Sequence, residues 1–191
     1  IQENKLWMLQ TRRGKRTGIA AIKIATDMVK EKLITKEMAV SRVRPVQIYE
    51  SLLKNIVAED LNNNAPVSSG LPAGPGASSG LAVFSAEKAE ALGKKGKRVV
   101  LIREETSPED IHGMHYSEGI LTSRGGLTSH AALVARGWGK SCVVGCQDLT
   151  IDKSNKFAKI ADKKIKEGDL ITLNGSSGDI YLGEMRLFQN P

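Results

Sequence analysis

The sequence has few aromatic residues, few cysteines and no long apolar run, and each shortage excludes a class of protein. Aromatic residues make up 4% of the 191 residues, which argues against the stacking platforms of proteins that bind single-stranded nucleic acid. No run of about 18 apolar residues occurs, so no membrane span is predicted. No secretory signal is visible. The chain starts at Ile1 rather than Met, and we interpret it as a fragment whose targeting signals lie elsewhere.

The two cysteines, Cys142 and Cys146, are too few for a zinc site or a disulfide framework. They are spaced C-x3-C on an apolar segment, without the further His or Cys ligands that structural zinc needs. Free cysteine is commonly buried, so we expect two buried thiols in a reducing compartment. The expected location is the cytoplasm, with an organelle such as a plastid or glycosome left open.

Positive charge is in excess, with a formal net charge of +7. Basic residues gather at 12–16 and at 94–98, without interleaved aromatic residues. One interpretation is a solvated basic surface, and the other is a surface that meets anions such as nucleotides or phosphoenzymes. We expect neither nucleic acid nor a membrane as a partner.

The pattern of apolar residues predicts a helical region followed by an α/β domain. A short strand is expected at 5–10, and helices at 17–33, 35–43 and 46–61. Residues 66–80 are rich in Gly, Pro, Ser and Ala, which suits either a flexible tether or an ordered glycine-rich turn. Beyond residue 80, strands and helices alternate, which predicts a mixed sheet. The expected strands are 81–85, 98–103, 119–122, 141–144, 157–160, 170–174 and 179–182, and the expected helices are 86–92, one starting near 107, and 128–138.

Residues 121–136 form the stretch that carries chemistry. Gly125 and Gly126 predict a tight turn after a strand, and Thr128 or Ser129 then caps an apolar helix that we expect to be largely buried. His130 falls in the first turn of this helix.

The start of a helix suits a histidine that carries phosphate. The first backbone N–H groups of a helix lack internal partners, and with the helix dipole they form an anion site. The same field disfavours imidazolium, which keeps the ring neutral and nucleophilic. A covalent histidine intermediate splits one difficult transfer into two easier ones. The alternative is that His130 is a core or capping residue.

Residues 125–136 read GGLTSHAALVAR and resemble the phosphohistidine signature of the phosphoenolpyruvate-utilising enzymes. Met is more usual at the position of Leu127, but both side chains fill the same apolar space. Four flanking segments resemble the pyruvate phosphate dikinase branch of that family. These segments are residues 9–17, 70–77, 105–114 and 139–146.

The resemblance implies a swivelling phosphohistidine domain of β/β/α type, preceded by a helical linker. Its implied boundaries are 67–183, with the end of an ATP-grasp domain at 1–22, the helical linker at 23–66 and the start of a second linker at 184–191. The second linker would lead to a barrel domain that binds pyruvate and phosphoenolpyruvate.

The reaction implied by the resemblance is a reversible phosphotransfer through the tele nitrogen of His130. His130 would accept the β-phosphoryl group of ATP, with phosphate giving AMP and pyrophosphate, and pass it to pyruvate. The implied cofactors are Mg²⁺ and a monovalent cation, K⁺ or NH₄⁺, in the whole enzyme, with none bound in this chain. The implied partners are the ATP-grasp and barrel domains of the same chain, in a homodimer, and the fragment alone would be inactive.

Other residues receive implied roles as well. Phosphate-stabilising or capping roles fall on Arg124, Gly125, Gly126, Thr128 and Ser129. Thr128 is also a candidate regulatory phosphorylation site, where a second dianion would repel the incoming phosphoryl group. Gln10 and Arg12 would be remnants of an ATP site, and His112 and His115 are expected at the surface.

Three alternatives remain open at this point. Two are other enzymes of the family, phosphoenolpyruvate synthase and the first enzyme of the sugar phosphotransferase system. The third is a non-catalytic docking module, which predicts no acid-labile phosphate on His130.

Overall fold

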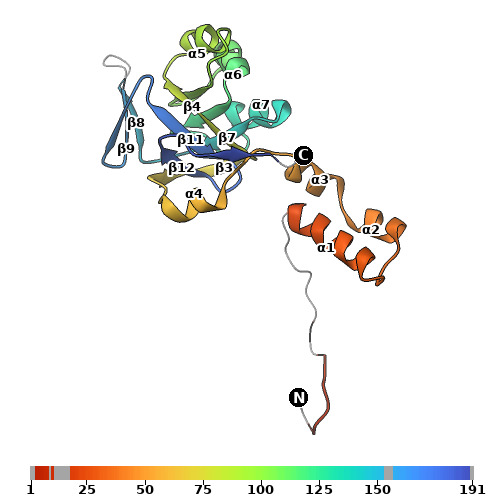
Figure 1. Cartoon of the computed structure of the whole chain (residues 1–191). Coiled ribbons are helices and arrows are strands. Elements are labelled where there is room, and N and C mark those ends of the chain that lie inside the picture. The colour runs from red at the N-terminus through yellow and green to blue at the C-terminus, as the bar shows by residue number, and fades with distance from the viewer. Residues whose placement is uncertain (1–2, 9, 11–17, 153–156, 190–191) are drawn as a thin grey trace. The chain divides into compact units, whose positions relative to one another are not determined.

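The computed structural model describes residues 3–8, 10, 18–152 and 157–189, and it divides the chain into two compact units. The smaller unit is Ile1–Ser51 and the larger is Leu52–Pro191 (Figure 1). The larger unit therefore begins before residue 67, where the sequence placed the domain boundary. No helix in the described ranges is long and apolar enough to cross a membrane.

Among the described residues of the smaller unit, three short helices make up the regular structure, and Thr35 caps the second one. They are α1 (Gly18–Lys30), α2 (Lys36–Arg42) and α3 (Pro45–Ser51). The Thr35 side chain accepts a hydrogen bond from the Met38 N–H at 3.3 Å, which satisfies a free donor of the first turn.

Two expectations for the first 61 residues are wrong. The strand expected at 5–10 is absent from residues 5–8 and 10, where Lys5 alone forms a bridge. The helix expected at 46–61 is interrupted after Ser51 by β1 (Asn55–Ile56) and resumes as α4 (Ala58–Asn63). The interruption has a long-range cause, because β1 pairs with β13 (Leu187–Phe188) near the other end of the chain.

The larger unit is built on an eight-stranded sheet, and the predicted α/β class with a mixed sheet is confirmed. Its order is β2-β12-β11-β4-β5-β6-β7-β3, in which β4 to β7 run parallel. The strands are β2 (Ser68–Ser69), β3 (Leu71–Gly74), β4 (Ala77–Val83), β5 (Val99–Arg103), β6 (Gly119–Thr122), β7 (Ser141–Val144), β11 (Leu170–Asn174) and β12 (Asp179–Leu182). The stretch 66–80 is thus an ordered part of the sheet and not a flexible tether.

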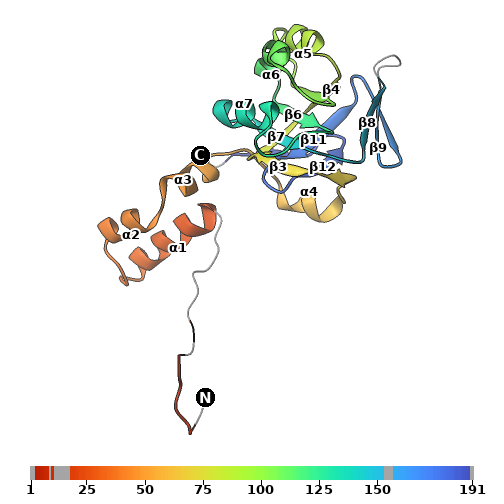
Figure 2. The same cartoon turned by 180° about the vertical axis from the view of Figure 1, so that it is seen from behind.

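Helices cover one face of this sheet and a second sheet covers the other (Figures 1 and 2). The helices are α5 (Ala86–Gly93), α6 (Ile111–Tyr116) and α7 (His130–Trp138), with a 3-10 turn at Pro108–Asp110 before α6. Alternate residues of β5 face opposite layers, as strand geometry requires. Val99 and Leu101 pack under the helices, whereas Val100 and Ile102 pack against the second sheet.

The second sheet has the order β10-β9-β8. It contains β8 (Leu149–Asp152), β9 (Phe157–Ile160) and β10 (Lys163–Lys166). β8 and β10 were not predicted. In β10, lysine occupies most positions and Ile165 is the one buried residue, so the sequence there has no run of apolar residues that would indicate a strand. The resulting order of layers, sheet on sheet on helices, is the expected β/β/α arrangement.

Candidate functional site

His130 lies at the carboxyl edge of the parallel strands, where β6 ends and α7 begins. This edge is where α/β sheets commonly bind ligands. Ser129 is the N-cap of α7, and its side chain accepts a hydrogen bond from the Ala132 N–H. Of the two capping candidates, the structure therefore selects Ser129 over Thr128.

A pocket of about 160 Å³ opens beside the imidazole, and we call it the His130 pocket. The loop after β5, the end of β6, the loop that follows it and the start of α7 form its wall. Its lining residues are Glu105, Thr106, Thr122, Arg124, Gly125, Ser129, His130 and Ala131.

The imidazole of His130 is held from one side. Its Nδ1 lies 3.1 Å from the hydroxyl Oγ1 of Thr106, a residue that is 5% exposed. No residue in the described ranges forms a hydrogen bond with Nε2. When the Nδ1–H donates to the threonine oxygen, the lone pair is on Nε2, which leaves that atom free to bind a ligand. The ring itself is partly exposed.

Backbone donors at this helix start remain open. The N–H groups of His130 and Ala131 have no acceptor among the described residues, as expected for the first turn of a helix. The Ser129 N–H donates to the Gly126 carbonyl at 3.0 Å, which closes the turn before the helix. An anion bound to Nε2 would therefore meet unpaired donors and the positive end of the helix dipole.

Gly125 has a backbone conformation that this turn requires. Its φ is +100°, in the left-handed region that favours glycine. A Cβ at this position would lie 2.9 Å from the Ser129 Cβ, so a side chain would displace the helix cap. Gly126 differs, because a Cβ there meets nothing within 4 Å.

The structure brings together some of the predicted site residues and leaves others apart. Arg124, Gly125, Ser129 and His130 line one pocket, with Arg124 exposed. Gly126 and Thr128 do not line it, and Thr128 is exposed at the turn. The roles proposed for all of these residues toward phosphate remain predictions.

The predicted ATP-site remnant lies in the smaller unit. Gln10 is exposed and outside any helix or strand. Arg12 lies outside the described residues.

Helix α7 is less buried than its composition predicted. Ala131, Ala132 and Ala135 pack against the sheet, but Leu133 is 57% exposed and Trp138 is 42% exposed. The expectation of a largely buried helix is wrong for its outer face, because the sheet covers one side of the helix alone.

The expected burial of the two cysteines and the expected surface positions of two histidines are confirmed. Both Cys142 and Cys146 are buried and free, and burial raises the pKa of the Cys142 thiol to about 12. His112 and His115 are exposed. In the described part of the chain, no group of three or more His, Cys, Asp or Glu side chains could hold a metal ion.

Thr106 is the site residue that sequence reasoning missed. It comes 24 residues before His130 and reaches it because β5 and β6 pair in parallel, with Arg103 opposite Thr122. The sequence did contain a signal that could have identified Thr106. Carboxyl ends of neighbouring parallel strands meet at one edge, so a hydroxyl just after β5 is placed beside a histidine just after β6.

Comparison with known proteins gives consistent results along the chain. Residues 95–178 match the family described as PEP-utilising enzyme, mobile domain. Over 98% of its length the chain is 50% identical to pyruvate, phosphate dikinase 1 of Arabidopsis thaliana, and 51% identical to pyruvate, phosphate dikinase of Flaveria pringlei, both chloroplastic. The chain spans about a fifth of these relatives, 19% and 20% of their lengths.

A solution NMR structure of Enzyme I is also similar in part. It covers 44% of this chain and 30% of its own, with 28% identity and a TM-score of 0.33. The family match covers α7 and four of the eight strands of the central sheet, β5, β6, β7 and β11, and the identity to the dikinases extends on both sides of it. The chain is a relative of the pyruvate, phosphate dikinases and contains the mobile domain of the PEP-utilising enzymes.

Proposed function

We propose that this chain is the phosphocarrier part of a pyruvate, phosphate dikinase, with the phosphoryl group carried on Nε2 of His130. The observation that supports it most is the imidazole itself, which lines an open pocket and has its Nδ1 in contact with Thr106. Its relatives at about 50% identity are dikinases, which favours this reaction over that of the synthase or the sugar phosphotransferase enzyme.

Each transfer exchanges one bond to phosphorus for another. In the first half-reaction the Nε2 lone pair attacks the β-phosphorus of ATP, and phosphate removes the terminal phosphoryl group, so that AMP and pyrophosphate leave. In the second, an oxygen of enolised pyruvate attacks the phosphorus, the N–P bond breaks, and phosphoenolpyruvate forms. The Nδ1–H remains on the ring in both halves, where Thr106 accepts its hydrogen bond.

The start of α7 stabilises charge on the transferred group. The open N–H groups of His130 and Ala131 would donate to phosphoryl oxygens, and Arg124 lies at the same pocket. The helix dipole contributes about 0.3–1 kcal/mol to such an anion, which helps to hold the phosphoryl group but does not by itself drive its transfer.

We place the metal ions and the two chemical sites on other parts of the whole protein. The described residues offer no ligand set for Mg²⁺, which would supply charge neutralisation at the triphosphate and the enolate. ATP-grasp and barrel domains of the same chain are the proposed partners, in a homodimer. The proposed location is a reducing compartment, either cytoplasm or plastid, in line with the chloroplastic relatives.

A regulatory role for Thr128 is part of the proposal. Its side chain is exposed and it lies two residues before His130, so a kinase could reach it. Phosphate on Thr128 would repel a second dianion arriving at Nε2.

Labelling with phosphoenolpyruvate tests the proposal directly. The whole protein should acquire one acid-labile, base-stable phosphate, and His130→Asn should abolish it. His115→Asn is the matched control, because His115 is exposed and outside the His130 pocket, and that variant should label normally. Label that survives in His130→Asn would refute the assignment.

A further inference from the structure

We propose that Arg103 and Asp110 are positioning residues for His130, which act by fixing the loop that carries Thr106. This inference rests on the proposed function and adds a layer of residues behind the imidazole. Neither side chain lines the His130 pocket, and neither is part of the phosphohistidine signature at 125–136.

Asp110 fixes the loop from the side of the 3-10 turn. Its carboxylate Oδ2 accepts a hydrogen bond from the Ser107 N–H at 2.9 Å, and Oδ1 lies 3.1 Å from Nη2 of Arg103. Asp110 is 4% exposed. The amide that it holds belongs to the residue directly after Thr106, so movement of Asp110 would move the threonine backbone.

Arg103 holds the carboxylate in place from the end of β5. Its Nη1 donates to the Phe84 carbonyl at 3.3 Å, which anchors the guanidinium to the neighbouring strand end. Its Nε is buried without a hydrogen-bond partner among the described residues.

An ion pair that has a buried carboxylate, a half-buried guanidinium and an unsatisfied donor is a poor source of stability. Desolvation of the two charges offsets most of their attraction, and apolar replacements are often neutral or stabilising. The Arg103 Nε adds the cost of an unmade hydrogen bond. What such a pair does supply is a fixed geometry, and here the fixed element is the loop beside His130.

The same loop is tied on its other side to the turn before α7. The Arg124 N–H donates to the Glu104 carbonyl at 2.8 Å, and the Ser123 N–H donates to the Arg103 carbonyl at 3.2 Å. The loop after β5 and the turn before α7, which form two walls of the His130 pocket, are therefore joined by backbone hydrogen bonds. We call this hydrogen-bonded arrangement the frame, and the Arg103–Asp110 ion pair is the part of it that lies behind Thr106.

The chemical consequence concerns which ring nitrogen is free. With Thr106 held 3.1 Å from Nδ1, its hydroxyl oxygen is placed to accept the Nδ1–H, and in that tautomer the lone pair is on Nε2. If the loop relaxes, the contact lengthens, the other tautomer becomes populated, and Nδ1 can also act as a nucleophile. Loss of the frame should therefore lower the transfer rate and change which isomer of phosphohistidine forms.

The experiment compares Asp110→Asn with Asp60→Asn in the whole protein. Asp60 is the matched control, because it also pairs with an arginine and accepts a backbone N–H, both from Arg186, far from His130 in the fold. After phosphorylation by phosphoenolpyruvate, alkaline digestion releases the two phosphohistidine isomers, which are then separated and measured. Asp110→Asn should slow single-turnover phosphorylation about tenfold, as expected for weakening one hydrogen bond, and should yield some Nδ1 isomer.

The control should keep the parental rate and the single Nε2 isomer even if its melting temperature falls. The concentration of phosphoenolpyruvate for half-maximal rate should stay unchanged in both variants, since that ligand binds elsewhere. A folded Asp110→Asn protein with parental rate and isomer would overturn the inference.

A second variant covers the case in which Asp110→Asn does not fold. Arg103→Met with Asp110→Leu removes both charges and leaves no lone buried ion. It should fold and show the same slower rate and mixed isomers, and parental behaviour in this double variant would equally overturn the inference.

Failure of the proposed function would look different. The parental protein itself would then carry no phosphate on His130. In that case, modification of His130 by diethyl pyrocarbonate, followed by peptide mass spectrometry, still tests the frame: a faster or slower reaction in Asp110→Asn than in Asp60→Asn supports it, and equal rates refute it.

Discussion

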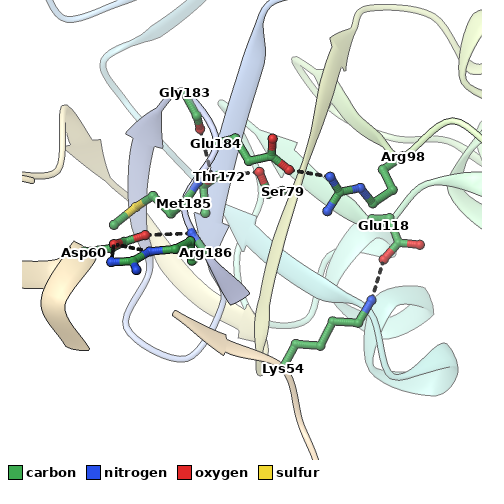
Figure 3. Close-up of polar contacts among 10 residues, drawn as sticks. All are labelled: Lys54, Asp60, Ser79, Arg98, Glu118, Thr172, Gly183, Glu184, Met185 and Arg186. Carbon is green, nitrogen blue, oxygen red and sulfur yellow. Dashed lines mark hydrogen bonds and ion pairs between the residues drawn. The ribbon is translucent and has the colours of Figure 1, made fainter. Parts of the chain in front are cut away.

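The two edges of the parallel strands in the larger unit use their polar groups in different ways. At the carboxyl edge, Nε2 of His130 and the first N–H groups of α7 have no partner among the described residues, next to an open pocket. At the amino edge, where the chain enters and leaves the unit, the polar side chains drawn in Figure 3 are paired with one another or with the backbone. Open groups are available to a ligand, whereas paired groups stabilise the fold.

The amino edge joins segments far apart in the sequence. The Arg186 Nε donates to Asp60 Oδ1 at 2.9 Å, and Lys54 pairs with Glu118 at 3.1 Å. The Thr172 hydroxyl donates to the Gly183 carbonyl at 2.8 Å and accepts from the Met185 N–H at 3.1 Å (Figure 3). These contacts hold residues 183–186 against the sheet. Substitutions of the residues that make them should therefore change the free energy of unfolding and leave phosphotransfer intact.

The largest expected effect is at Gly125. Gly125→Ala places a Cβ 2.9 Å from Ser129 at a φ of +100°, which displaces the helix cap and the open donors beside His130. We expect phosphorylation of His130 in the whole protein to fall roughly 100- to 1,000-fold, the loss typical of a removed anion-stabilising donor. A single-turnover assay with phosphoenolpyruvate measures it.

Gly126→Ala is the matched comparison, since its Cβ meets nothing within 4 Å. Its melting temperature should equal that of the parent, while that of Gly125→Ala should be several degrees lower. Equal melting temperatures for the two variants would contradict the geometry described for the turn.

Thr106→Val tests the other wall of the pocket. The change keeps the shape of the side chain and removes the oxygen that lies 3.1 Å from Nδ1 of His130. We expect an about 100-fold slower phosphorylation, as for misplacement of a reacting group. Stability should change little, and urea unfolding checks that. A parental rate in this variant would mean that the ring is oriented by something else.

The corresponding hydroxyl at the amino edge should behave in the opposite way. Thr172→Val leaves the Gly183 carbonyl and the Met185 N–H without their partner, at a cost of about 1–3 kcal/mol in the free energy of unfolding. Phosphorylation of His130 should proceed at the parental rate below the melting transition. A slower phosphorylation rate in fully folded Thr172→Val protein would contradict the distinction drawn between the two edges.

Local sequence patterns predicted the parts of this molecule whose causes are local. The GGLTSH stretch placed a turn, a cap and a histidine at a helix start, since each depends on its immediate neighbours. The alternation of strands and helices after residue 80 gave the central sheet for the same reason.

What could not be predicted depends on distant pairing. Asn55–Ile56 is a strand because Leu187–Phe188 lies beside it, and no pattern within two residues can reveal that. Thr106 reaches His130 through the register of β5 and β6. Whether the outer side of α7, which includes Leu133, is exposed depends on which layers cover the helix. The apolar composition of the helix alone therefore predicted more burial than the structure has.

The smallest expected effect concerns the pH dependence of the pair at the amino edge. Hydrogen bonds from the Arg186 side chain, and then from its backbone, lower the pKa of Asp60 below its ordinary value of 3.8. A carboxyl whose pKa is lower in the folded state than in the unfolded state stabilises the fold above the unfolded pKa. That contribution disappears as the pH falls through the folded pKa. The melting temperature of Asp60→Asn should therefore lie below that of the parent between pH 5 and 7, by a small amount because the Arg186 side chain is exposed and exposed pairs contribute little. The gap should begin to narrow near pH 3.8, and the two curves should converge only below the folded pKa of Asp60, which lies lower still, because the parental carboxyl is neutral there as well. A gap that stays constant while the pH falls through the folded pKa would show that Asp60 acts through shape and not through charge, and the amino edge would then owe its stability to packing and neutral hydrogen bonds.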